Sequence, residues 1–224
     1  MSVQFDSGIN PNINVVNQAT VPLGVDLAAL VDAMNLYVSD HLGPTWGVGC
    51  KLSIGKKVTT TGWNMVFLDN ADAPGALAYH DITNKGWPIL KVFVKTTLAD
   101  KALVSVSASH ELAEALVDPG CDLWCQGPGG FMYAYESADA VEETDFPVNG
   151  IPMSNFVTPL WYESYRKSGK FDHLGKCSKP FQLLPGGYAI LMKQGVISQK
   201  FGSKAKEARF ALEDRRQHRS EYRR

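Results

Sequence analysis

The sequence predicts an α+β protein in which a mixed, twisted sheet packs against two helices. Apolar residues recur at helical spacing between Leu27 and Val38, and a second helical stretch runs from Ser107 to Asp118. Between these stretches lie short runs that are rich in β-branched and aromatic residues and have the length of strands. A chain of 224 residues is long enough to bury one core of this kind.

The first helix has Asp26 near its start, and Gly43-Pro44 is expected to close it because proline cannot continue a helix. Four strands are expected before the second helix, over residues 48–54, 63–68, 75–81 and 89–94. A last strand is expected over residues 188–192. Residues 146–192 as a whole are expected to form short strands and turns over the site, and no separate domain.

Three parts are expected along the chain: a polar N-terminal arm (residues 1–20), one folded domain (21–200) and a basic, helical tail (201–224). The apolar stripe of the tail is thin, so its helix is expected to order only against a partner. From Lys193 onward the chain carries ten Lys and Arg against four Asp and Glu, although the net charge of the whole chain is -1. The body is therefore acidic, and the two parts are expected to meet different partners.

The N-terminus lacks the basic start and apolar run of a signal peptide, and no stretch reaches the roughly 18 apolar residues of a membrane helix. A cytoplasmic location without membrane association is therefore expected. The four cysteines, Cys50, Cys121, Cys125 and Cys177, fit no Cys-x-x-Cys zinc site. Free thiols in a reducing compartment are the preferred interpretation, and a Cys121–Cys125 or Cys121–Cys177 bridge is the alternative.

Residues 107–120 carry the clearest chemical signal. They read as a helix that Pro119-Gly120 ends. His110 and Glu114 are one turn apart and share a face, with Glu111 beside them. An imidazole and a carboxylate at this spacing can hold a zinc ion, and the neighbouring carboxylate can take a proton from water. The pattern is that of the His-Glu-x-x-His zinc helix with Glu114 in place of the second histidine, and a solvated helix face is the alternative.

Acidic residues also gather in residues 132–143. If this segment opens a helix, Glu136, Asp139 and Glu143 share one face. Carboxylates on one face repel each other unless a cation lies among them, and residues 102–165 contain no Lys or Arg. A bound metal would relieve this repulsion, and full solvation of the carboxylates is the alternative.

The chain resembles a set of largely uncharacterised bacterial and phage-encoded proteins. The shared motifs are Gly-Ala-Leu-Ala-Tyr-His-Asp, Lys-Val-Phe-Val, Ser-His-Glu-Leu-Ala-Glu-Ala-Leu-Val-Asp-Pro, Tyr-Glu-Ser-Ala-Asp-Ala-Val-Glu, Phe-Val-Thr-Pro-Leu-Trp-Tyr-Glu and Pro-Gly-Gly-Tyr. The chain is also locally similar to the plant EXORDIUM-like, phosphate-induced family in His-Glu-Leu-Ala-Glu and the Pro, Trp and Glu-x-x-Asp that follow. The resemblance implies a zincin-like (metalloprotease-like) fold, in which a mixed sheet backs onto the metal-binding helix and its edge strand can pair with an extended peptide.

The resemblance implies less about activity, and the leading hypothesis from the residues is a zinc-dependent metallopeptidase. His110 and Glu114 are the implied metal ligands, together with Glu136 or Asp139. Glu111 is the implied general base, which takes a proton from water and passes it to the leaving amine. Because a Glu ligand is harder than imidazole, calcium, or no ion at all, is the alternative to zinc.

Further residues are expected close to these ligands, namely Asp118, Glu142 and His80. Asp118 would orient the His110 ring, whereas a lone histidine at a strand end, such as His80, is more often structural. Tyr133 or Tyr135 would contact the substrate and donate to the oxyanion, with aromatic packing as the alternative. The substrate would be an extended peptide laid along the strand at residues 91–95.

The main rival is a non-catalytic structural protein on the same scaffold. In a phage-encoded chain this would be a virion part, in which residues 1–20 and the basic tail dock onto neighbouring virion proteins. The carboxylates would then bind a structural cation or none, and the protein would be incorporated in a virion. Nucleic-acid binding through the basic tail is a third hypothesis. No known base-recognition motif or base-stacking surface accompanies the Lys and Arg residues of the tail.

Overall fold

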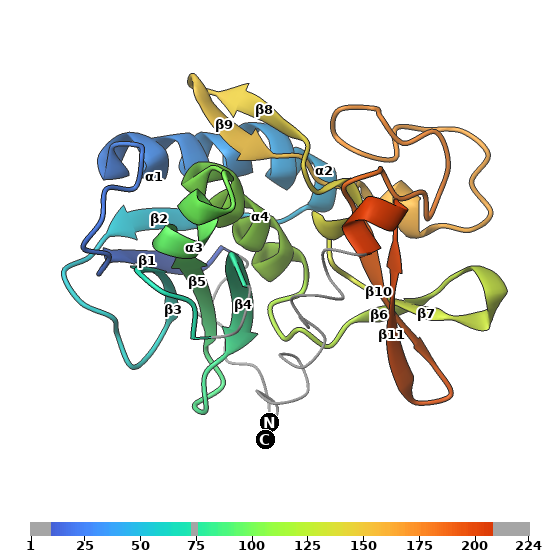
Figure 1. Cartoon of the computed structure of the whole chain (residues 1–224), viewed down its shortest axis with the longest axis horizontal. Coiled ribbons are helices and arrows are strands. Elements are labelled where there is room, and N and C mark those ends of the chain that lie inside the picture. The colour runs from blue at the N-terminus through green and yellow to red at the C-terminus, as the bar shows by residue number, and fades with distance from the viewer. Residues whose placement is uncertain (1–9, 73–75, 208–224) are drawn as a thin grey trace.

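The structure is a computed structural model that describes residues 10–72 and 76–207. A five-stranded sheet lies on the left in Figure 1, built from β1 (Asn12–Asn17), β2 (Lys51–Ile54), β3 (Trp63–Leu68), β4 (Ala78–Ile82) and β5 (Pro88–Phe93). The order across the sheet is β2-β1-β3-β5-β4. β4 runs antiparallel to β5, and the other neighbours are parallel. β4 is therefore an edge strand, whereas β5 has a neighbour on each side.

The first helix is longer than the sequence predicts. It starts as α1 (Leu27–Leu36), passes through a π-helical turn, η1 (Tyr37–Leu42), and continues as α2 (Gly43–Trp46). The prediction that Gly43-Pro44 closes this helix is therefore wrong. Proline is tolerated because it lies in the first turn of α2, where a missing N–H costs little. The helix ends at Gly47, whose positive φ of 70° suits a glycine.

The second helix is α4 (Val104–Val117), which follows the short α3 (Val94–Ala99). Ala108, Leu112 and Ala115 of α4 are fully buried in the core that the sheet forms with α1. The small side chains of Ala108 and Ala115 let the helix lie close to the sheet, while Leu112 fills the space between them. We call residues 10–117 the sheet region.

The rest of the described chain, residues 118–207, is the C-terminal region and, apart from residues 145–154, lies mostly on the right in Figure 1. Its elements are β6 (Trp124–Gln126), η2 (Pro128–Gly130), β7 (Met132–Ala134), η3 (Asp139–Val141), β8 (Asp145–Val148), β9 (Ile151–Ser154), η4 (Pro159–Tyr162), β10 (Tyr188–Lys193) and β11 (Val196–Phe201). A four-stranded sheet has the order β11-β10-β7-β6. Its aromatic cluster includes Tyr133, Trp161, Phe171 and Phe181. Short strands and turns are thus held together largely by aromatic packing.

The β8–β9 hairpin joins the two regions. Phe146, Val148 and Met153 of this hairpin are part of the same core as the sheet and α4. In Figure 1 the hairpin lies across the top of α1 and α4. The expectation that residues 146–192 form no separate domain stays a prediction.

The chain is of the mixed α+β class, as the sequence predicts. The predicted arm is wrong for residues 12–17, which form β1 between β2 and β3. Ile13 and Val15 are fully buried there, because apolar residues alternate with asparagines as a strand requires. Residues 1–9 of the arm and residues 208–224 of the predicted tail lie outside the described residues.

The conditional helix over residues 132–143 is also wrong. Its first residues form β7, which pairs with β6 and β10, and Asp139–Val141 form a single 3₁₀ turn. Glu136, Asp139 and Glu143 therefore do not share a helical face. Pairing with two strands and burial of the Tyr133 ring outweigh the local helical pattern.

Two smaller predictions can be compared directly. All four cysteines are free thiols, which confirms the preferred interpretation over a bridge. Within residues 10–72 and 76–207, no helix is long and apolar enough to span a membrane.

Candidate metal centre

The candidate site lies where β4, α4 and η3 meet. β4 carries His80, α4 carries His110, Glu111 and Glu114, and η3 carries Asp139. Glu111 is only 6% exposed, Glu114 4% and Asp139 2%. Carboxylates buried to this extent require hydrogen bonds, counter-charges or a metal ion.

The first group of potential ligands is His110, Glu114 and Asp139. Nε2 of His110 is 3.4 Å from Oε1 of Glu114 and 3.2 Å from Oδ1 of Asp139. One donor atom from each residue lies within 4.8 Å of the others. The backbone N–H of Ala138 donates to Oε1 of Glu114 at 3.2 Å, so η3 and α4 are fixed against each other.

The second group is His80, Glu111 and Glu114, all three of which are buried. Nδ1 of His80 is 3.1 Å from Oε2 of Glu111 and 3.7 Å from Oε2 of Glu114. Glu114 therefore belongs to both groups and directs a different oxygen at each histidine. These two groups are buried clusters that could hold a metal ion.

The first group fits a zinc ion by distance and by donor type. Zinc bonds to imidazole nitrogen and carboxylate oxygen are about 2.0–2.2 Å long, so tetrahedral ligand atoms lie roughly 3.3–3.6 Å apart. The measured separations of 3.2 and 3.4 Å around Nε2 of His110 agree with this spacing. Imidazole and carboxylate are donor types that zinc accepts, although one imidazole with two carboxylates differs from the ligand sets of well-known catalytic zinc sites, which are three histidines, two histidines with a glutamate, or two cysteines with a histidine.

The pKa values of the clustered residues indicate that bound positive charge stabilises the site. Burial and, after it, the Glu114 charge raise the pKa of Asp139 to about 8, although His110 acts in the opposite direction. Burial disfavours the charged form of His110, but Glu114 and Asp139 outweigh burial and raise the pKa of that imidazole. The pKa of His80 is also raised, because Cys121 and Glu111 outweigh burial. Without a cation, the cluster is stabilised by protons, and a metal ion would replace them.

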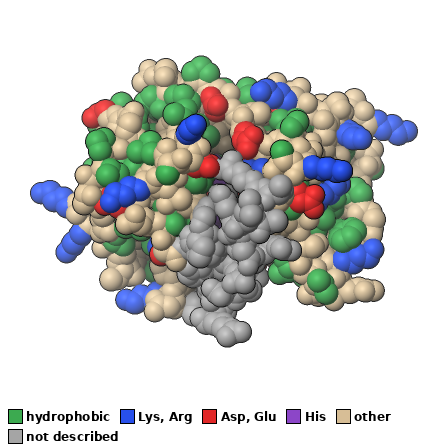
Figure 2. Space-filling view, viewed as in Figure 1, with side chains coloured by type: hydrophobic (Ala, Val, Ile, Leu, Met, Phe, Trp, Pro, Cys, Tyr) green, Lys and Arg blue, Asp and Glu red, His purple; other side chains and the backbone are tan. Residues whose placement is uncertain are grey.

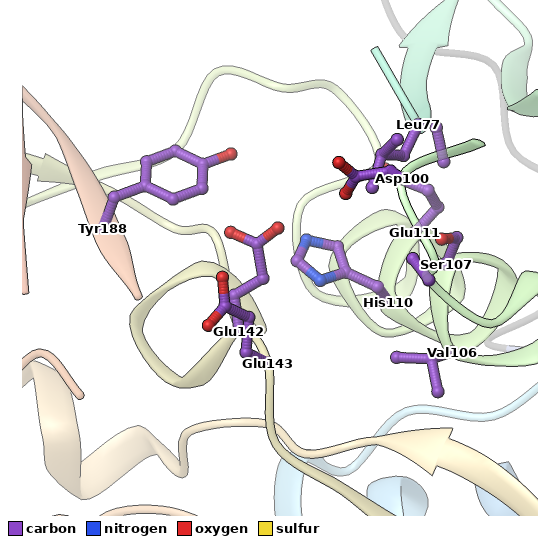
Figure 3. A pocket seen from close by; sticks show the side chains of 11 residues that line it. Leu77, Asp100, Val106, Ser107, His110, Glu111, Glu142, Glu143 and Tyr188 are labelled. Carbon is purple, nitrogen blue, oxygen red and sulfur yellow. The ribbon is translucent and has the colours of Figure 1, made fainter. Parts of the chain in front are cut away.

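A pocket of about 130 Å³ opens beside His110. Figure 3 shows the His110 ring pointing into it, with Glu142 and Glu143 on the facing side and Tyr188 across the opening. Glu111 also lines this pocket, as do Leu77 and Ala78 at the start of β4. A small substrate group could therefore reach His110 and Glu111 together.

Glu142 was expected near the ligands, and it is in the pocket wall. Its Oε2 is 2.8 Å from Nζ of Lys206, which is also 3.5 Å from Oε1 of Glu143. Lys206 thus supplies a cation that the local sequence lacks. In Figure 2, most other Lys and Arg side chains project at the edge of the visible face, whereas several acidic side chains lie toward its middle.

The two candidate third ligands are placed differently. Asp139 contacts His110, whereas Glu136, although buried, belongs to neither group of ligand atoms found in the described part of the chain. The backbone carbonyl of Glu136 accepts a hydrogen bond from the Tyr162 hydroxyl at 3.0 Å. The geometry therefore favours Asp139, and a ligand role for Glu136 stays a prediction.

Asp118 contacts the backbone just after α4, and a role in orienting the His110 ring stays a prediction. Its two carboxylate oxygens accept backbone N–H groups of Asp122 and Leu123 at 3.1 and 3.0 Å. The side chain thereby fixes the turn after α4, while His110 is in contact with Glu114 and Asp139.

Tyr133 and Tyr135 do not line the pocket. Tyr133 is 2% exposed and packs against Trp161 and Phe181 in the aromatic cluster. The Tyr135 ring stacks on Tyr162, with ring centres 4.3 Å apart. For Tyr133 the packing alternative is correct, because its ring is enclosed, and a substrate role for Tyr135 stays a prediction.

The predicted path of a peptide along residues 91–95 is wrong. β5 is paired on both sides, and Val94 begins α3, so no free strand edge exists there. The edge strand on this side of the sheet is β4.

Neither Tyr188 nor Lys206 was expected near the site. Both lie near the C-terminal end of the described chain, and only the fold brings Tyr188 into the pocket lining and Lys206 against Glu142. Cys121 was also missed as a neighbour of His80: its thiol donates to the His80 carbonyl at 3.5 Å. A long separation along the chain leaves no local signal for contacts of this kind.

Comparison of the chain with protein-family models, curated proteins and solved structures finds no match. Any functional assignment therefore depends on the residues of the site.

Proposed function

We propose that the chain is a zinc-dependent hydrolase on a zincin-like scaffold, and that it cleaves peptide bonds. The observation that carries this proposal is the convergence of His110, Glu114 and Asp139 beside a pocket that Glu111 also lines. A mixed sheet with an antiparallel edge strand, backed by the helix that bears these residues, supports the choice of scaffold.

His110, Glu114 and Asp139 would hold the zinc ion. Zinc bound there would act as a Lewis acid and lower the pKa of a water molecule. Glu111 is the general base: its carboxylate takes a proton from the attacking water and passes it to the leaving amine. His80 is 3.1 Å from Glu111 and keeps this carboxylate directed along α4.

The proposed substrate is an extended peptide paired with β4. β4 has one neighbour in its sheet, and Leu77 and Ala78 at its start line the pocket next to His110. A peptide added to this edge would be held by backbone hydrogen bonds and would pass the site. This position replaces the internal strand that the sequence suggested.

The test begins with zinc content, measured by elemental mass spectrometry on the wild type and on His110→Ala, with His41→Ala as the matched control. We expect bound zinc in the wild type and in the control, and one zinc ion fewer per chain in His110→Ala. An unchanged zinc content in His110→Ala would contradict the proposed ligand set.

Hydrolysis is then measured on a quenched-fluorescence peptide library with the wild type and Glu111→Gln. We expect Glu111→Gln to keep zinc and to lose roughly 10²–10⁴-fold in turnover, because the general base is removed. Equal turnover in both proteins, or hydrolysis that is unchanged in His110→Ala, would reject the enzyme. A zinc-binding protein without activity would point to the structural alternative.

A further inference from the structure

We propose that a second divalent cation binds at His80, Glu111 and Glu114, so that Glu114 bridges two cation positions. The proposal shares Glu114 with the zinc site above but does not depend on hydrolysis. It assigns a metal-binding role to the buried middle residue of β4, His80, which faces a different oxygen of Glu114 from His110.

The first observation is that two carboxylates converge on a single nitrogen. Nδ1 of His80 is 3.1 Å from Glu111 and 3.7 Å from Glu114. One N–H group can make one good hydrogen bond, and 3.7 Å is too long for a second. A cation at this position would contact all three donor atoms at once, and separations of this size are close to the edges of a zinc coordination shell.

The second observation is the arrangement of Glu114. Its Oε2 faces His80 and its Oε1 faces His110, so each oxygen is directed at a different imidazole. The Ala138 N–H, which donates to Oε1, holds the carboxylate in this orientation. Carboxylates that present one oxygen to each of two positions are suited to paired metals about 3.5–4 Å apart.

The third observation is the balance of charge. Glu111, Glu114 and Asp139 are all more than nine-tenths buried, and together they can carry three negative charges. One divalent cation leaves this set with a single negative charge. Buried carboxylates are costly unless they are neutralised, so either a proton on His80 or a second cation at the same position would have to balance that charge.

Occupation of the second position has a consequence for Glu111. In the form with one cation, this carboxylate is available to accept a proton. In the form with two cations it is a ligand, so the two forms differ in whether Glu111 can act as the general base.

The test is a titration of the metal-free, full-length chain with zinc alone, followed by calorimetry and by elemental analysis after removal of free metal. The variants His80→Gln and Glu111→Gln remove the second position, and Asp139→Asn weakens the first. His41→Gln is the control for loss of an imidazole outside the cluster, and circular dichroism checks the fold of each variant. Glu111→Gln is nearly isosteric, so it preserves the test if His80→Gln does not fold.

We expect two zinc ions per chain in the wild type and in His41→Gln, and one in each of the other three variants. Glu114→Gln should weaken both positions by roughly tenfold or more, since it removes charge from the shared ligand. X-ray absorption of the fully loaded protein should show a metal–metal distance of about 3.5–4 Å.

One zinc per chain at saturation, unaffected by His80→Gln and lost in His110→Ala, would overturn the second position and leave the proposed zinc site intact. Two zinc ions that both persist in His80→Gln and Glu111→Gln would also overturn it. No bound zinc at all would reject both the second position and the proposed function.

Discussion

The sheet region and the C-terminal region both contribute to the metal centre, but they position their residues in different ways. In the sheet region, a 14-residue helix packed on a sheet carries His110, Glu111 and Glu114. In the C-terminal region, Asp139 lies on a three-residue 3₁₀ turn. The first set is fixed by regular structure, whereas the second depends on how the surrounding loops pack.

The packing around Asp139 explains how so short a turn can hold a buried carboxylate. The Ala140 carbonyl accepts the N–H of Leu184, and the Ser137 carbonyl accepts that of Val157. Gly187 approaches so closely that a Cβ there would lie 2.2 Å from the Ala140 carbonyl oxygen. The turn is therefore held in place by segments that are distant in sequence. The part of the site that contains Asp139 is only as stable as the packing of the C-terminal region.

The largest expected effect tests whether the two regions unfold together. Phe67→Ala in the sheet core and Phe171→Ala in the aromatic cluster each remove a ring that is at most 1% exposed. Each should lower the free energy of unfolding by about 3–5 kcal/mol, measured by urea denaturation. Since the β8–β9 hairpin joins the cores, both variants should unfold in a single transition.

The exposed Tyr165 provides the control, because Tyr165→Ala removes a ring that is 73% exposed and should change the free energy by less than about 0.5 kcal/mol. Two separate transitions in Phe171→Ala would show that the C-terminal region is an independent unit.

A smaller effect is expected at the junction of the regions. Asp118→Ala removes the acceptor of two backbone N–H groups just after α4. The free energy of unfolding should fall by about 1.5–3 kcal/mol, as is usual for hydrogen bonds to a charged group. Urea denaturation measures this, and Asp122→Ala, which leaves its own backbone N–H in place, is the control. A wild-type stability in Asp118→Ala would mean that the turn does not need this cap.

The smallest effect concerns His173, which stacks on Phe156 and contacts Phe146 at the boundary of the regions. Burial, and then the charges of Lys170 and His41, lower the pKa of His173 from 6.5 to about 4. The unfolded chain therefore binds more protons between these values. The stabilisation of the fold by the uncharged His173 ring is fully present above about pH 6.5 and is lost as the pH falls through about 4.

His173→Phe removes this proton site and keeps a ring. As the pH falls from 6.5 to 4, the free energy of unfolding of this variant should rise by about 1–2 kcal/mol relative to that of the wild type. This value is smaller than the full pKa shift of His173 would give, because the ring is partly exposed. Urea denaturation across this pH range is the measurement. Parallel pH profiles of the two proteins would refute the assignment.

Much of the sheet region could be predicted from the sequence because its signals are local. The run from Trp63 to Leu68 is β3 with the predicted bounds, and α4 begins within a few residues of its predicted start. The one-turn spacing of His110 and Glu114 fixes their common face before any tertiary contact forms. β1 was misread since its alternating pattern is short and lies near the N-terminus.

The sequence by itself thus determined the α+β class, the helix that bears His110, Glu111 and Glu114, and the presence of acidic residues downstream. Only the tertiary structure decided that Asp139 meets His110, that His80 meets Glu111 and Glu114, and that Lys206 lies against Glu142. The physical reason is one of range. Helical and strand periodicity are properties of neighbouring residues, whereas these contacts join segments about 30 to 60 residues apart, and burial of the shared core brings them together.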